Sequence, residues 1–440
     1  HHGFHGGIAM ALLFFSIQEG TTTFDPESRR IVTTRFSDAI SEILAGDAWG
    51  SMDITEPQAG SDMGALRTRG EQDETGQWTV TGQKIFITSG HGKYHCVIAR
   101  TEDHVPNDDP LAGLAGLSMF LVPASHRGED GKETPTASFG RIEEKLGHHA
   151  SATVVVDFDR TPAHLIGKRG EGFKYMLIMM NNARVGVGFE CIGLCEAAYR
   201  LARDYASERK SMGKTLDRHE LIADLLDEMK VDLVALRALA MHGAYEEEMA
   251  RKKALAREWL TDADLRPTED EILCHRRRAR RVTPLVKYLA AEKAVEMARR
   301  CIQILGGVGY TKEYGAEKLL RDAIVMPIYE GTSQIQALMT MKDALSGVMK
   351  RPQDFVRRVA QARWRGLSEK DPLARRVAKL QSLGLSAQQT LLRKTAMEKL
   401  GTLQGIPLHR WLSVFTKDWD PKRDFAHAKL HAERLTRILT

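Results

Sequence analysis

Apolar residues near the start of the chain recur at the three- and four-residue spacing of helices. Residues 8–20 have the pattern of the end of one helix, and residues 35–46 predict a second. In the second segment the apolar side chains share one face, which comprises Phe36, Ile40, Ile43 and Leu44. The pattern predicts an N-terminal helical segment over residues 1–49.

From about Gly50 to Asp159 the pattern changes to short alternating runs rich in Gly, Thr and Val. Residues 78–87, 117–122 and 153–158 predict strands, because alternation places successive side chains on opposite faces of a sheet. Several short strands joined by loops are typical of a sandwich or a barrel. We therefore expect a middle β-domain over residues 50–160, with both forms left open.

Helical periodicity returns after Gly172 and continues to the end of the chain. Residues 284–304, 314–325 and 332–348 predict helices with one apolar face each. The clearest stripe has apolar residues spaced by three and four, namely Leu226, Met229, Leu233, Leu236 and Ala240. Such faces are buried against other helices, which predicts a helical bundle over residues 161–348.

Two charged regions accompany the bundle. An insert at about 246–282 predicts a helical excursion, and residues 349–440, rich in Arg and Lys, predict a helical C-terminal extension. The basic run His275–Arg281 favours a solvated helix face, while peripheral membrane contact or an acidic partner stays open. The predicted fold class is therefore α+β with several domains.

Composition is that of an ordinary globular protein, with 42% hydrophobic and 28% charged residues and a formal net charge of +5. The small positive excess favours anionic ligands such as a pyrophosphate but does not require nucleic acid. The five cysteines are odd in number and widely spaced, which favours reduced, mostly buried thiols and a cytoplasmic location, or the mitochondrial matrix in a eukaryote. No apolar run approaches the length of a membrane span, and no metal site is expected.

Two segments of the β-region could line a flat heterocycle. ITEPQAGSD, Ile54 to Asp62, offers hydroxyls and a glycine that allows close backbone approach, although an ordinary turn explains it equally well. KIFITSG, Lys84 to Gly90, offers an aromatic ring and a hydroxyl, although a strand with a core Phe is the more common explanation of such a pattern.

Three segments of the helical region could bind phosphate or supply a base. ERKSMGKTL, Glu208 to Leu216, places cations around a glycine, as does many a solvated helix end. QILGGVGY, Gln303 to Tyr310, indicates a glycine-capped helix end or a backbone that meets phosphate, and it lacks the Rossmann spacing. YEGTSQIQ, Tyr329 to Gln336, places a carboxylate directly before a helix start, where it could also merely favour the helix dipole.

In this order and spacing, the five segments closely resemble the acyl-CoA dehydrogenase family from about residue 50 to 345. The resemblance implies an N-terminal helical domain, a middle β-domain and a C-terminal four-helix bundle. Residues 1–49 would be a partial remnant of that N-terminal helical domain, and most of the domain is not expected in this sequence. The charged insert and the extension resemble a longer branch of the family, whose members often form dimers.

The resemblance implies FAD as the cofactor and assigns its contacts. The flavin ring would meet Met52, Ile54, Thr55 and Ser61 on one side and Phe86, Ile87 and Thr88 on the other. The FAD of a neighbouring subunit would meet Arg209, Ser211 and Met212, with its adenosine-pyrophosphate part on Gln303, Gly306 and Gly307. Thr332 and Gln334 would contact FAD beside the base. A homo-oligomer follows, with a dimer favoured over a tetramer.

The resemblance also implies the reaction, the α,β-dehydrogenation of an acyl-CoA to the trans-2-enoyl-CoA in fatty-acid β-oxidation. Glu330 would be the catalytic base, and Ala183, where some relatives place the base, cannot accept a proton. Substrate contacts would come from Ser61, Asn181, Arg184 and Gly331. Many relatives have an acidic residue where this chain has Asn181.

Electrons would pass to an electron-transfer flavoprotein. Two alternatives stay open: an acyl-CoA oxidase that uses oxygen, and a flavoprotein of this fold that binds nucleic acid without turning over acyl-CoA. The Arg-rich extension favours the second alternative, and the intact YEGT segment opposes it.

Overall fold

The computed structural model describes residues 2–103, 112–128, 130–260, 262–401, 407 and 425–440. The chain divides into two compact units. The first unit consists of His1–Val187, Ala256–Arg266 and Thr311–Val325, and the second of Gly188–Leu255, Pro267–Tyr310 and Met326–Thr440. Helix α3 (Gly172–Glu208) belongs to both units. The mixture of helices and sheet confirms the predicted α+β fold class.

The first unit contains a small closed barrel. Strand β11 pairs with both β5 and β7, and β6 pairs with both β7 and β4, so that five strands close a ring through the β4–β5 pair. Strand β10 flanks β11, and β3 runs parallel beside β6. The strands are β3 (Gly50–Asp53), β4 (Arg69–Gln72), β5 (Trp78–Thr88), β6 (Tyr94–Arg100), β7 (Leu117–Pro123), β10 (Ala137–Ile142) and β11 (Thr153–Ile166). Of the two forms left open by the sequence, the pairing therefore favours the barrel.

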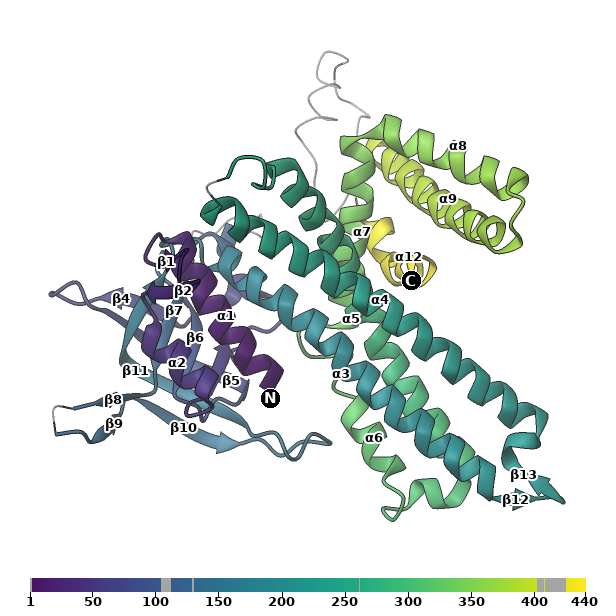
Figure 1. Ribbon diagram of the computed structural model, residues 1–440, viewed down its shortest axis with the longest axis horizontal. Helices are drawn as coiled ribbons and strands as arrows, with labels where there is room; N and C mark the ends of the chain where they lie inside the picture. Colours follow the sequence, from purple (N-terminus) through teal and green to yellow (C-terminus); the bar gives the residue numbers. More distant parts are fainter. Residues whose placement is uncertain (1, 104–111, 129, 261, 402–406, 408–424) are drawn as a thin grey trace. The chain divides into compact units, whose positions relative to one another are not determined.

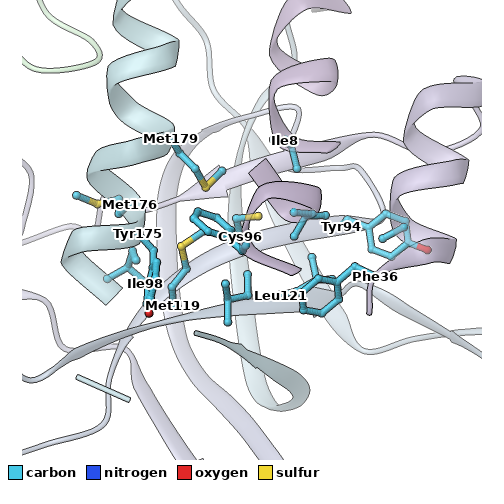
Figure 2. Close-up of a cluster of buried hydrophobic side chains, with 14 of the residues drawn as sticks. Ile8, Phe36, Tyr94, Cys96, Ile98, Met119, Leu121, Tyr175, Met176 and Met179 are labelled. Carbon is cyan, nitrogen blue, oxygen red and sulfur yellow. The ribbon is translucent and has the colours of Figure 1, made fainter. Parts of the chain in front are cut away.

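Two apolar clusters flank the wall of this barrel. One fills the interior and includes Val80, Val97 and Phe120. The other lies between β6, β7 and the helices α1, α2 and α3 (Figure 2). Its labelled side chains are Ile8, Phe36, Tyr94, Cys96, Ile98, Met119, Leu121, Tyr175, Met176 and Met179. Strand β6 is thus buried on both faces, which is why its sequence lacks the alternation of a half-exposed strand.

The remaining elements of the first unit surround the barrel. Helix α1 (His2–Gln18) begins before the predicted residue 8, and α2 (Ser37–Ala45) ends at Gly46, whose φ of 84° is left-handed. Two short hairpins escaped prediction because their strands are only three or four residues long. The hairpins are β1 (Thr23–Asp25) with β2 (Arg30–Thr33), and β8 (Ser125–Arg127) with β9 (Glu133–Pro135). The other elements outside the barrel are η1 (Met63–Ala65), η2 (Ala112–Leu114) and α6 (Ala316–Ala323).

The second unit is built on long helices. In α4 (Glu220–Trp259) the predicted apolar stripe from Leu226 to Ala240 is buried. The charged insert lengthens α4 and α5 (Glu269–Leu305), and the capping box of Thr268 and Glu271 begins α5. The remaining elements are β12 (Lys210–Ser211), β13 (Lys214–Thr215), η3 (Leu216–Arg218), η4 (Gly306–Tyr310) and α7 (Ser333–Lys350).

The C-terminal extension belongs to the second unit. Helices α8 (Pro352–Ser368) and α9 (Pro372–Gly401) form an antiparallel hairpin (Figure 1). Helices α11 (Ala426–Leu430) and α12 (Ala432–Leu439) pack on α7, with Ala428, Ala432 and Leu435 buried beside Met341. The described part of the extension is therefore mainly helical and shares a core with the bundle.

Four of the five cysteines are buried, and all five are free thiols. Burial raises the pKa of Cys301 to about 12, so this thiol stays protonated at neutral pH. No helix among the described residues has both the length and the apolar character needed to cross a membrane.

Candidate active site

A buried ion pair holds the loop that follows β3. The Lys84 ammonium lies 2.8 Å from a carboxylate oxygen of Glu56, and both side chains are almost fully buried. Lys84 Nζ also donates to the Ile54 carbonyl at 3.0 Å, and the Ile85 N–H donates to the Thr55 carbonyl at 2.9 Å. Three consecutive residues of the loop, Ile54, Thr55 and Glu56, therefore take their position from β5.

The same carboxylate fastens the far end of the loop. Glu56 accepts hydrogen bonds from the N–H groups of Arg67 at 2.7 Å and Thr68 at 3.0 Å. Burial alone would raise the pKa of Glu56, but the charge and hydrogen bond of Lys84, with the donors at 67 and 68, lower it to about 2. Glu56 is therefore ionised at neutral pH and keeps all these contacts.

A second buried network, made of hydrogen bonds, fixes strand β3. The Ser51 hydroxyl donates to Asp53 at 2.5 Å, and His95 Nδ1 lies 2.8 Å from the other Asp53 oxygen. His95 Nε2 lies 3.1 Å from the Gly92 carbonyl. All three side chains are fully buried, so this network fixes the strand that carries Met52 and has no access to a ligand.

The residues predicted to meet the flavin ring lie together at one end of the barrel wall, on β3, its loop and the end of β5. Met52, Ile54 and Thr55 are half-buried, while Ser61 and Thr88 are exposed. Phe86 is 61% exposed and has a left-handed φ of 58°, which turns its ring out of the regular alternation. The Ile87 side chain, in contrast, is buried in the barrel interior, so it can offer only its backbone to a ring.

The predicted base lies in the second unit, in a strained turn before α7. Glu330 has a φ of 54° and Gly331 a φ of 88°, so two successive residues are left-handed. Thr332 caps α7, and its hydroxyl accepts from the Ile335 N–H. The Ser333 hydroxyl donates to Glu292 of α5 at 2.5 Å, which fixes the start of α7 on the bundle.

The residue before Glu330 is also held. The Tyr329 hydroxyl donates to Glu190 of α3 at 2.6 Å. Burial, with the negative charge of Glu190, raises the pKa of Tyr329 far above its usual range, so the phenol stays a donor. The turn is thus attached to α3 through its phenol and to α5 through Ser333.

The other predicted FAD contacts of the second unit are exposed, except for Ser211, which is half-buried. Arg209 directly follows α3, Ser211 and Met212 lie in the β12–β13 hairpin, and Met212 is 93% exposed. Gln303, Gly306 and Gly307 lie where α5 passes into η4, and open space surrounds both glycines. Gln334 is exposed on the first turn of α7 and donates to Glu433 of α12 at 2.7 Å.

The predicted substrate contacts Asn181 and Arg184 lie one turn apart on the part of α3 in the first unit. Arg184 is only 3% exposed, and its guanidinium donates to the Asn181 side chain at 3.2 Å. The amide of Asn181 thus accepts the hydrogen bond that an acidic residue would accept in its place. Gly331 lies in the second unit.

Three residues with direct roles in holding the site were not predicted as such: Glu56, Lys84 and Gln336. All three lie inside the quoted motifs. One sequence signal could have indicated the ion pair: Lys84 interrupts the apolar positions of a strand. A buried ammonium without a partner would be very costly, so a buried acidic partner is expected. The sequence could not identify its partner, which lies 28 residues away.

Comparisons with known proteins show the family of this chain. A model of the acyl-CoA dehydrogenase middle domain matches residues 51–161, and one of the acyl-CoA dehydrogenase C-terminal domain matches residues 170–345. An acyl-CoA dehydrogenase of Bacillus subtilis is 33% identical over 314 residues, which cover 70% of this chain and 71% of the relative. The butyryl-CoA dehydrogenase structure from Megasphaera elsdenii superposes with a TM-score of 0.57 at 26% identity, over 80% of this chain and 79% of that one.

A flavoprotein dehydrogenase is thus the class that fold and site define. The chain belongs to the acyl-CoA dehydrogenase family, whose members depend on FAD and act on CH–CH groups. A further relative, 3-methylmercaptopropionyl-CoA dehydrogenase of Ruegeria pomeroyi, is 35% identical over 68% of this chain. The chain spans only 50% of that relative's length.

The residues present fit FAD. The exposed Phe86 ring offers an apolar surface for a flavin, and the open backbone at Gly306 and Gly307 admits a phosphate or ribose. The exposed cations Arg209 and Lys210 suit a pyrophosphate. These features occur in the segments that the sequence assigned to the cofactor.

Proposed function

We propose that this chain is the catalytic part of an FAD-dependent acyl-CoA dehydrogenase that converts an acyl-CoA to its trans-2-enoyl-CoA. The observation that carries the proposal is the placement of Glu330: a carboxylate in a strained turn, at the N-terminus of α7, attached on two sides to the bundle. A group held in this way is pre-organised for proton transfer.

In the proposed reaction Glu330 takes the α-proton of the thioester, and its own backbone N–H donates to the thioester carbonyl. That N–H stabilises the negative charge that develops on the oxygen as the proton leaves. FAD, when bound, supplies the acceptor for the hydride from the β-carbon. The substrate thus loses one proton and one hydride, and a C=C double bond forms.

The cofactor would be held by the loop after β3, by Phe86 and Thr88, and by Thr332 and Gln334. Arg209, Ser211 and Met212 would reach the FAD of a second copy, as would Gln303, Gly306 and Gly307. The exposure of all of these except Ser211 supports that role. The working protein would then be a homo-oligomer. Ser61, Asn181, Arg184 and Gly331 would contact the acyl-CoA.

An electron-transfer flavoprotein is the proposed electron acceptor, because the relatives named above are dehydrogenases rather than oxidases. Anaerobic titration with a panel of acyl-CoAs tests the proposal. Loss of flavin absorbance with at least one acyl-CoA, without oxygen present, supports it. A flavin-loaded protein that no acyl-CoA bleaches, and that instead retains DNA in a salt-dependent manner, would overturn it in favour of a nucleic-acid-binding flavoprotein.

A further inference from the structure

The side-chain amide of Gln336 is fully buried and contacts the strained turn of Glu330. Gln336, on the first turn of α7, is 0% exposed. Its Nε2 donates to the carbonyl oxygens of both Glu330 and Gly331, each at 3.2 Å. Its Oε1 is buried and has no hydrogen-bond partner among the described residues. Leaving an amide oxygen unpaired is costly, so the two bonds made by Nε2 are the contacts that explain a glutamine here.

The two bonds act on the conformation of the turn. A trans peptide directs its C=O and its N–H to opposite sides. When Nε2 holds the carbonyls of Glu330 and Gly331 on one side, the N–H groups of Gly331 and Thr332 must point to the other. Glu330 and Gly331 have left-handed φ values of 54° and 88°. Glu330 is not a glycine, so it adopts such a value only when its surroundings impose it.

Further contacts hold the ends of the turn. The Ser333 N–H donates to the Pro327 carbonyl at 2.8 Å, and the Gln336 N–H donates to the Thr332 carbonyl at 2.9 Å. Tyr329 and Ser333 are attached to α3 and α5, respectively. Within the described residues, the Gln336 side chain is the group that bonds both carbonyls at the centre of the turn.

We propose that Gln336 is the positioning residue that sets the direction of the Glu330 carboxylate and of the backbone beside it. Because its side chain is fully buried, Gln336 would act through the turn. The inference rests on the proposed function, because it assigns Gln336 a part in presenting the base.

The test replaces Gln336 by Met, which has similar length and volume but cannot donate. Thr340→Val is the matched control, because Thr340 lies one turn further on the same helix, is 6% exposed and has an unpartnered hydroxyl. We expect flavin content to be kept in both variants. The rate of flavin reduction at saturating acyl-CoA should fall on the order of 10–100-fold in Gln336→Met and stay unchanged in Thr340→Val.

Gln336→Glu adds a readout that a purely structural role would not move. An ionised carboxylate faces two carbonyl oxygens without a proton to donate, whereas the protonated acid can donate to one of them. The rate relative to wild type should therefore rise as pH falls. Amide hydrogen exchange of residues 327–333 should be faster in Gln336→Met than in wild type, whatever the catalytic rate.

Three results distinguish a failure of the role proposed for Gln336 from a failure of the proposed function. If an acyl-CoA bleaches the wild-type flavin and the Gln336→Met variant is reduced at a rate within twofold of wild type, this inference alone is overturned. Unchanged amide exchange of the turn in Gln336→Met also overturns it, even in a protein that does not turn over. A flavin-loaded wild type that no acyl-CoA bleaches overturns the proposed function, and with it the catalytic consequence proposed for Gln336.

Discussion

Removing the ammonium of Lys84 should destabilise the first unit strongly. The change Lys84→Met leaves the Glu56 carboxylate, which is 3% exposed, without its partner at 2.8 Å. Breaking a buried pair from one side typically costs about 3–5 kcal/mol. The lowered pKa of Glu56, about 2 instead of 4.5, points the same way, because the charge and the hydrogen bond of Lys84 are its main lowering causes.

The sign of the pH dependence follows from the same pair. Since the pKa of Glu56 is lower in the folded protein, its contribution is fully present above pH 4.5 and is lost as pH falls toward 2. Glu56→Gln should flatten the stability profile in this window. The double variant Glu56→Gln with Lys84→Met should recover most of the loss, because it removes both buried charges.

Urea unfolding of the four proteins at pH 7, followed by circular dichroism, measures the coupling between the two side chains. Lys93→Met is the control, because Lys93 pairs with Glu42 at 2.9 Å near the surface and should cost less than about 1 kcal/mol. The reasoning fails if Lys84→Met costs no more than Lys93→Met. It also fails if the double variant is as unstable as Lys84→Met alone.

Three further predictions concern the cofactor, assembly and packing. Acid extraction of the purified protein should release FAD and not FMN, as chromatography would show, because the segment from Gln303 to Gly307 suits an adenosine-pyrophosphate. Arg209→Ala should loosen flavin and lower the oligomeric state together, and light scattering that finds an active, flavin-loaded monomer would exclude that role. Gly172→Ala should lower the thermal midpoint by several degrees, because its Cβ would clash with the Ser118 carbonyl carbon, whereas Gly193→Ala, with open space around it, should not.

Strong periodicity made the helices of this chain predictable, and short alternating or apolar runs did the same for some of its strands. The stripe from Leu226 to Ala240 is buried as its spacing requires, and β5 and β7 begin at the predicted residues. Strand β6 was not predicted: it is buried on both faces and so lacks alternation, whereas the equally buried β7 was indicated by its apolar run LSMFLV. The β12–β13 hairpin was missed because two strands of two residues leave no pattern to read.

The motifs located the candidate site, but its supporting contacts depend on tertiary structure. YEGT placed Glu330 directly before a capped helix, and the structure agrees, with Thr332 as the cap. The bond of Gln334 to Glu433 could not be predicted, because the two residues lie 99 positions apart and meet only when the extension folds onto α7. The strained turn itself also left no signal, since a positive φ at a glutamate contradicts local preference and is imposed by packing.

The most direct test of Glu330 as the base is stopped-flow flavin reduction by the Glu330→Gln variant with a saturating acyl-CoA. The amide is nearly the same size and keeps the backbone N–H, so FAD and acyl-CoA should still bind with little change in affinity. A neutral amide cannot take the α-proton, so the rate of flavin reduction should fall by about 10²–10⁴-fold. If the variant bleaches at close to the wild-type rate, Glu330 is not the base, and the account of this site is wrong.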